Sequence, residues 1–212
     1  YGANPHLTTL NGLSALQLAE LKRSDSQKEG NEGLKAAYAA IITLLKSKET
    51  ADATVNGVPP IVQAIRDNNP GRLTQLMKDL VDVNAVDEHT GATALMLAAW
   101  HGNGVLVTQL LAAGADVKAQ TNEGLTALHN AVANGHEQLV AQLLGVGADV
   151  TAQTNEGRTP LHDAIVAEHL SMVKMLVKWG APLDARNNLG QTPLDLARLG
   201  ASGSLMRGLA PD

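Results

Sequence analysis

Short stripes of apolar residues at helical spacing alternate along this chain with polar stretches. Leu161, Ala164 and Ile165 occupy positions i, i+3 and i+4, which predicts one apolar face of a short helix. A second stripe of this kind covers residues 139–144. The polar segment 117–124 follows another such stripe and is expected to be extended and to end in a turn. The pattern predicts a unit of helix, turn, helix and extended finger.

This unit repeats at a fixed interval. Four glycines, each thirty-three positions after the last, mark its start: Gly91, Gly124, Gly157 and Gly190. The residues that follow also recur, as in Gly124-Leu-Thr-Ala-Leu-His129 and Gly157-Arg-Thr-Pro-Leu-His162. Self-similarity at this period is typical of a stacked repeat protein, in which each unit contacts only its neighbours.

Start and stop signals support the helix boundaries. The Thr159 hydroxyl can cap free backbone N–H groups, and Pro160 suits the first helical position because its missing N–H had no partner there. Glycines that can adopt the left-handed conformation separate the two helices or end the second one, at Gly102, Gly135, Gly114, Gly147 and Gly180.

These residues closely resemble the ankyrin repeat. Its G-x-T-P-L-H-x-A…G-H…L-L-x-x-G-A-D pattern matches residues 124–150 and 157–183 almost residue for residue. The resemblance implies an all-α repeat solenoid of stacked helix-turn-helix units with short β-hairpin fingers along one edge. In that family, a partner protein usually docks on the concave surface made of fingers and first helices.

The repeats predict a single ankyrin-repeat domain over residues 1–212. The stretch from Gly12 to Leu44 is longer by thirteen positions than the equivalent stretch from Gly91 to Leu110. The first unit therefore carries an insertion around Ser24–Gly33, where we expect a mobile surface loop. The predicted order is the tail of an earlier repeat (1–11), an irregular repeat with this insertion (12–56), four repeats (57–90, 91–123, 124–156, 157–189) and a C-terminal cap (190–212) with a short helix at 204–209.

Three departures from the pattern affect stability. Leu80 takes the place of Gly114, and a left-handed leucine costs about 1–2 kcal/mol. Pro59 replaces the capping threonine, and Glu168 replaces the glycine between helices. We therefore expect the repeat that starts at Gly57 to be the least stable of the later ones.

Composition narrows the function. The net charge of −5 comes without a basic stripe, which argues against nucleic acid and anionic membranes as partners. Aromatic residues make up 2% and Phe is absent, so base-stacking platforms are scarce. Cysteine is absent, which excludes disulfides and thiolate sites. No apolar run approaches the roughly 20 residues of a membrane span, so no membrane insertion is expected and the compartment stays open.

The histidines do not form a metal or catalytic pattern. The resemblance gives His129, His162 and His136 structural roles near the fingers and turns, and we expect His169 to be solvated. The pair His136-Glu137 lacks the second histidine that a zinc-binding helix needs four residues later. Asp87-Glu88 lacks the ligand pattern of a calcium loop, and no nucleophile elbow or phosphate loop is present. We expect no metal, no cofactor and no catalysis.

Exposed positions that vary between units predict the partner surface. Trp is enriched among interface hot spots, so both tryptophans are candidates, although each could instead pack over a neighbouring repeat. The predicted partner-binding residues are Trp100, His101, Asp87, Glu88, His89, Asn122, Glu123, Asn134, Asn155, Glu156, Arg158 and Trp179. The acidic fingertips favour a partner with a basic patch, and the alternative is an acidic solubilising rim.

The function predicted from these observations is a protein–protein interaction module that docks a protein partner on its concave finger and inner-helix surface. Two alternatives stay open. One is an inhibitor or immunity-type protein that occludes the active site of a toxin or enzyme. The other is the repeat module of a larger multidomain protein, which the start of the chain in the middle of a repeat supports.

Overall fold

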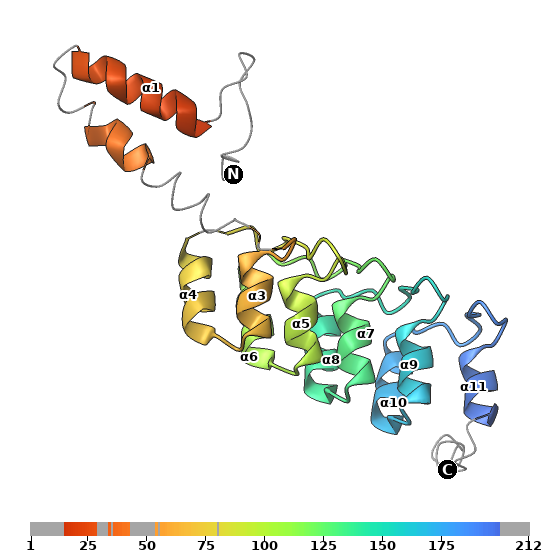
Figure 1. Ribbon diagram of the computed structural model, residues 1–212. Coiled ribbons are helices and arrows are strands. Elements are labelled where there is room, and N and C mark those ends of the chain that lie inside the picture. Colours follow the sequence, from red (N-terminus) through yellow and green to blue (C-terminus); the bar gives the residue numbers. More distant parts are fainter. Residues whose placement is uncertain are drawn as a thin grey trace.

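The computed structural model describes residues 15–28, 34, 36–42, 54, 56–79 and 81–199. Short helices follow one another in pairs (Figure 1). The pairs are α3 (Pro60–Arg66) with α4 (Pro70–Lys78), α5 (Ala94–Trp100) with α6 (Gly104–Ala112), α7 (Ala127–Ala133) with α8 (Glu137–Gly145) and α9 (Pro160–Val166) with α10 (Leu170–Lys178), followed by α11 (Pro193–Leu199). The helix pairs predicted from the glycine period are confirmed.

The first and second helices of the units form two rows. Helix α5 contacts α3 and α7, and α9 contacts α7 and α11, so the first helices form one continuous row, here called the inner row. Each of α3, α5, α7 and α9 also contacts its own second helix. The second helices α4, α6, α8 and α10 form the outer row. This arrangement confirms the all-α repeat solenoid.

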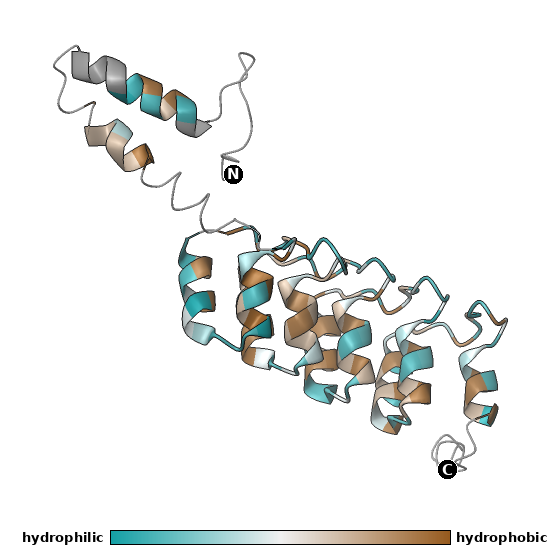
Figure 2. Cartoon of the chain, viewed as in Figure 1, coloured by the Kyte–Doolittle hydropathy of each residue, from teal (hydrophilic) through white to brown (hydrophobic). Residues whose placement is uncertain are grey.

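The apolar core lies between the two rows and runs through all the stacked units. Leu128, Ala131 and Val132 of α7 are fully buried between α5 and α9. The predicted stripe at 139–144 packs onto the same core, with Leu143 completely buried. Figure 2 shows hydrophobic residues gathered in these helices and hydrophilic residues along the loops between units. Because each unit buries its apolar face against its neighbours, the stack depends on adjacent repeats.

The turn between the two helices of each unit requires a left-handed residue. Gly102 and Gly135 adopt φ of 70° and 80°, as predicted. In the other two units Asn68 and Glu168 adopt φ of 49° and 58° at the same place. A side chain in this conformation costs about 1–2 kcal/mol, and Asn tolerates it better than Glu. The Glu168 turn is therefore a strained point of the stack.

The repeat that starts at Gly57 departs from the others in its first cap. Pro59 is the N-cap residue of α3 and makes no side-chain capping hydrogen bond, whereas Thr126 caps α7 through the backbone N–H of His129. Leu80 lies outside the described residues, so the low stability of this repeat stays a prediction.

The fingers between units are closed by hydrogen-bonded turns. The N–H of Thr121 donates to the carbonyl of Leu125 and that of Thr154 to the carbonyl of Arg158, both at 2.9 Å. Within the described residues a β-bridge occurs only at Val58, and no longer strand is present. The expected β-hairpins are therefore not confirmed, and the fingers are turns held by their neighbours.

The predicted first unit has a longer first helix than expected. Helix α1 (Ala15–Lys28) continues through Ser24, where the sequence predicted a loop, and residues 36–42 are also helical. Figure 1 draws these two helices beside each other and apart from the row that starts at α3. Residues 29–33, the tail at 1–11 and the expected helix at 204–209 lie outside the described residues. The first unit and the C-terminal cap stay predictions.

Replacing Glu168 by glycine should stabilise the protein. Glycine adopts φ near 58° without a Cβ clash, although it loses more chain entropy on folding, so the net gain is about 1 kcal/mol. Urea unfolding of Glu168→Gly should show a higher midpoint than the unchanged chain. Glu168→Ala removes the carboxylate but keeps the strained conformation, and an equal gain in this control would contradict the explanation.

Candidate protein-binding surface

A ladder of asparagines joins the fingers to one another. The side-chain amides of Asn122, Asn155 and Asn188 donate to the carbonyls of His89, Asn122 and Asn155, at 3.0, 2.8 and 2.8 Å. Their backbone N–H groups also donate to the preceding finger, to the carbonyls of Thr90, Glu123 and Glu156. Asn122 and Asn155 were predicted as partner-binding residues. The structure gives both side chains a role inside the ladder.

In the first finger, His89 makes the contact to the preceding repeat that the asparagines make in the later fingers. Its Nε2 lies 2.9 Å from the carbonyl of Asn56, one repeat earlier, just as each asparagine reaches back to the previous fingertip. The backbone N–H of Glu88 donates to Gly57, at 2.9 Å. A Cβ on Gly57 would lie 2.9 Å from a carboxylate oxygen of Glu88 and 3.3 Å from Nε2 of His89, so glycine lets this finger approach. His89 is thus bonded within the stack despite its exposure.

Asp87 is buried and not at the partner surface. Only 1% of its surface is exposed, and one carboxylate oxygen accepts the N–H groups of His89 and Thr90 at 2.8 and 3.1 Å. The other oxygen lies 2.5 Å from the Arg66 guanidinium. Burial alone would raise the pKa of Asp87, but these hydrogen bonds and the Arg66 charge outweigh it and lower the pKa. The prediction that Asp87 is a surface fingertip residue was wrong.

The reason is the type of residue at this place in the finger. Thr121, Thr154 and Asn187 each accept two backbone N–H groups of their own later fingers with an uncharged oxygen. In the first finger the charged Asp87 takes this place, and Arg66 of α3 neutralises it. The sequence shows the acidic residue and the arginine, but only the structure shows that they meet.

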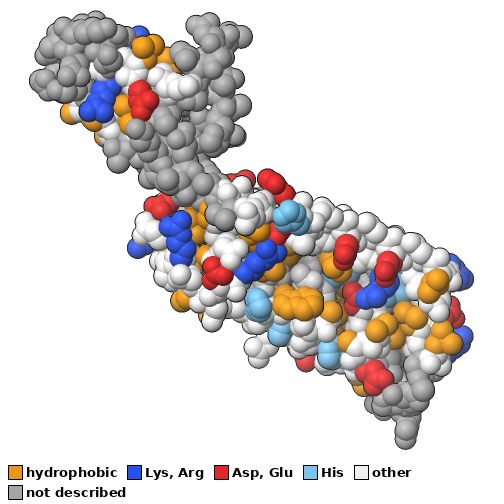
Figure 3. Space-filling model, in the orientation of Figure 1, with side chains coloured by type: hydrophobic (Ala, Val, Ile, Leu, Met, Phe, Trp, Pro, Cys, Tyr) orange, Lys and Arg blue, Asp and Glu red, His pale blue; other side chains and the backbone are white. Residues whose placement is uncertain are grey.

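Because Asp87 is buried, the exposed acidic groups at the fingertips are glutamates. Glu88, Glu123 and Glu156 are exposed, and Figure 3 shows acidic side chains along this edge of the molecule. Arg158, a predicted partner-binding residue, instead donates from Nε to the buried carboxylate of Asp163 at 2.8 Å. Its Nη1 also lies 3.7 Å from Glu156. The finger edge therefore presents three glutamates, and the charge of Arg158 is shared between Asp163 of its own helix and Glu156.

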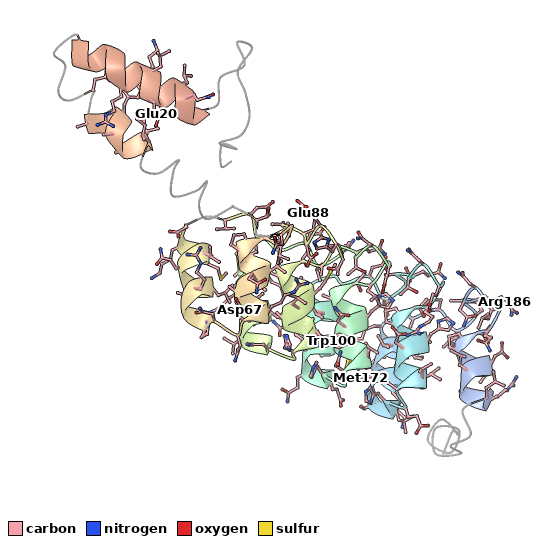
Figure 4. The ribbon with its side chains drawn as sticks, viewed as in Figure 1. Glu20, Asp67, Glu88, Trp100, Met172 and Arg186 are labelled. Atoms are coloured by element: carbon pink, nitrogen blue, oxygen red, sulfur yellow. The ribbon has the colours of Figure 1, made fainter. Side chains whose placement is uncertain are left out.

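The inner row carries the exposed tryptophan. Trp100 ends α5, and 51% of its surface is exposed. Figure 4 places it at the end of α5, with Glu88 at the finger edge. His101 and Asn134, the residues that follow α5 and α7, are also exposed. The side-chain amide of Asn134 donates to the carbonyl of Asn130 at 2.9 Å.

Trp179 lies elsewhere. It is 48% exposed, but it is the C-cap residue of α10 in the outer row. First helices begin beside a finger and end away from it, whereas second helices run back toward the next finger. The two tryptophans therefore lie in different rows and at opposite ends of their helix pairs. Trp179, predicted as a partner-binding residue, is therefore not on the inner row with Trp100.

Two exposed residues of the inner row were missed as site candidates. Val166 ends α9 with 60% of its surface exposed, and Leu199 ends α11 with 67% exposed. Both lie nine residues after a repeat glycine, the same position as Trp100. The period alone could have aligned them.

His129 and His162 join one repeat to the next from inside the core. Both are completely buried, and Nδ1 accepts the backbone N–H of Thr126 or Thr159, at 3.2 and 3.1 Å. The Nε2 atoms lie 3.3 and 3.2 Å from the carbonyls of Arg158 and Gln191 in the following unit. This places the proton on Nε2 of a neutral ring. Burial lowers the pKa of both histidines.

His136 and His169 occupy equivalent places at the turns. The Nε2 of His136 lies 3.0 Å from the carbonyl of Trp100, and its ring covers Gly102 so closely that a Cβ there would lie 2.5 Å away. His169 is the N-cap residue of α10, is half-buried and lies over Gly135 in the same way. The expectation that His169 is solvated was wrong, because it stands one full repeat after His136.

A hollow of about 620 Å³ opens where this histidine is missing. It lies between the pairs α3–α4 and α5–α6, and Asn68, His101 and Asn103 are among its lining residues. Asn103 stands one full repeat before His136, so no ring fills the space over the preceding turn. The hollow adjoins the end of α5 and enlarges the surface beside Trp100.

The described residues contain neither a candidate metal site nor a candidate membrane span. Among them, no group of three or more His, Asp or Glu side chains could hold a metal ion. In the part of the chain that the structure describes, no helix has the length and apolar character needed to cross a membrane.

The buried histidines predict a loss of stability at mildly acidic pH. Their folded-state pKa lies below the unfolded value of about 6.5, so the unfolded chain takes up protons first as the pH falls. The free energy of unfolding should be constant above about pH 7 and should fall as the pH drops below about 6.5. Urea unfolding across this range measures it.

The double variant His129→Gln, His162→Gln tests the assignment. It should be less stable than the unchanged chain near neutral pH and should lose less further stability on acidification. His101→Gln, at an exposed position, is the matched control and should keep the full pH dependence. An unchanged slope in the double variant would contradict the role of these two rings.

Comparison with known proteins agrees with this geometry. A family model described as ankyrin repeats, in three copies, matches residues 95–188. A human protein named mitochondrial disaggregase is 38% identical over 84 residues, which is 40% of this chain. The chain spans only 11% of the length of that relative. With the matched family model and the stacked helix pairs, residues 95–188 of this chain are ankyrin repeats.

Proposed function

We propose that the chain recognises a protein partner through its inner row and the exposed glutamates of its fingers. Ankyrin repeats are a general protein–protein interaction module, and the family is typically non-catalytic. The observation that carries the proposal is Trp100, a large aromatic side chain that is half exposed at the end of α5. Exposed tryptophans are frequent interface hot spots, where truncation costs about 2 kcal/mol or more.

The rest of the stack supports rigid docking. Asparagine and histidine side chains fix each finger to its neighbour, so the surface exists before a partner arrives. A preformed surface loses little conformational entropy on binding. The glutamates at the finger edge favour a partner with a basic patch, which they would attract before contact.

A photo-crosslinker tests which row meets the partner. Ala133 and Ala141 are both exposed alanines of the same repeat, the first in the inner row and the second in the outer row. With a photo-reactive residue at Ala133, the chain should crosslink to a specific protein in a lysate of its source cells. The same residue at Ala141 is the control and should give little product. Crosslinking through Ala141 alone, or none specific at either site, would contradict the proposal.

The charge at the fingers should affect the rate of association with the partner more than the rate of dissociation. Glu123→Gln should lower the association rate with the captured partner about two- to threefold at low ionic strength, because one steering charge is lost, and the difference should vanish in high salt. Glu137→Gln makes the same charge change in the outer row of the next repeat and serves as control. Surface plasmon resonance at two salt concentrations measures both rates. Equal effects of the two variants would argue against a basic patch at the fingers.

A further inference from the structure

One position of the inner row is apolar and exposed in four consecutive units. It is the last residue of each first helix, nine residues after the repeat glycine, and is occupied by Trp100, Ala133, Val166 and Leu199. The tryptophan, valine and leucine are 51%, 60% and 67% exposed, and the alanine is exposed as well. We call these four residues the apolar strip. Figure 3 shows hydrophobic side chains over the inner helices, below the acidic finger edge.

The strip is not needed for folding. Its side chains point away from the core, and the unit that starts at Gly57 carries Arg66 at the same position without losing the helix pair. Single exposed apolar residues are normal on protein surfaces, but a contiguous apolar patch marks an interaction site. The helices that carry the strip contact one another in order, so the four side chains stand in one row.

The spacing along this line matches an α-helix. Neighbouring packed helices lie about 8–10 Å apart, which sets the distance from one strip residue to the next. Seven residues of an α-helix rise about 10.5 Å, so every seventh side chain of a helix laid along the strip meets one unit. In an extended chain, side chains on one face recur about every 7 Å and fall out of step with the repeats.

The finger side of the strip is negatively charged. The exposed carboxylates of Glu88, Glu123 and Glu156 lie there. The described fingers also carry cations: Arg158 binds the carboxylate of Asp163 and its Nη1 lies 3.7 Å from Glu156, Arg186 donates to the carbonyl of Gly190 at 2.5 Å, and Lys118 lies near Asp149. Of these three cations only Arg158 pairs with a glutamate of the row, so Glu88 and Glu123 keep their negative charge.

The opposite side of the strip carries less charge. The turns that follow α5, α7 and α9 begin with His101, Asn134 and Ala167, and Glu168 is the only carboxylate in these three turns. A helix on the strip therefore meets most of the negative charge along the flank that faces the fingers.

We propose that the apolar strip binds an amphipathic α-helix of the partner protein, with apolar residues at every seventh position and Lys or Arg along the flank that faces the fingers. This inference rests on the proposed function and adds which structural element of the partner is bound. Strip and finger base are separated by the length of a first helix, about 10 Å, which the long side chains of a bound helix can span.

Synthetic peptides test the spacing directly. The probe is a labelled peptide of about 25 residues with Leu at four positions seven apart, Lys along one flank and Ala elsewhere, long enough to reach all four units. A second peptide has the same composition with its leucines placed around the helix, and a third carries Glu in place of Lys. Fluorescence anisotropy with the full chain should show the first peptide binding at least about tenfold more tightly than either of the others.

Two matched variants of the chain test whether the first peptide binds at the apolar strip. Val166→Glu, in the strip, should weaken the first peptide at least about tenfold. Val146→Glu makes the same change at a valine that is 50% exposed in the outer row and should leave the affinity unchanged. Circular dichroism of both variants confirms that they are folded.

Three results would overturn the inference: equal affinity for the first two peptides, no binding of the first peptide, or equal losses in the two valine variants. If a protein crosslinks through Ala133 while the leucine spacing has no effect, recognition by the inner row stands and only the helical partner is wrong. If crosslinking occurs through Ala141 alone, the proposed function itself fails.

Discussion

The contact between successive first helices is the constraint on which the rest of this structure depends. Helix α7 is enclosed by α5 and α9, and Leu128, Ala131 and Val132 are fully buried there. No unit has enough apolar surface of its own to form a core, so each position of one repeat must face the equivalent position of the next. The asparagine ladder and the buried histidines follow from this alignment, because each reaches a fixed point one repeat away.

The same alignment determines which side chains hold the stack together and which remain available at its surface. Side chains that reach a neighbouring repeat are occupied, which explains why His89, Asn122 and Asn155 are exposed and yet bonded within the stack. Positions without such a partner are free to vary. Trp100, Val166 and the finger glutamates belong to this group, and they determine which chemical groups the stack presents to a partner.

Much of the fold could be predicted from the sequence because its signals are local and repeated. The glycine period, the Thr-Pro starts and the apolar stripes gave the helix pairs and their turns. The candidate site was harder, since exposure depends on what the next repeat places nearby. From the sequence, Asp87 is predicted to be an exposed acidic residue at a fingertip. The structure instead surrounds its carboxylate with Arg66 and two backbone N–H groups. Trp179 varies between repeats as Trp100 does, but it follows a second helix, which puts it in the other row.

Hydrogen–deuterium exchange of the complex with its natural partner tests the central claim, recognition by the inner row, most directly. The account predicts new protection in peptides that cover the ends of α5, α7 and α9 and in the fingers at Glu123 and Glu156. Exchange along the outer row, in α6, α8 and α10, should not change. Protection confined to the outer row would contradict the account.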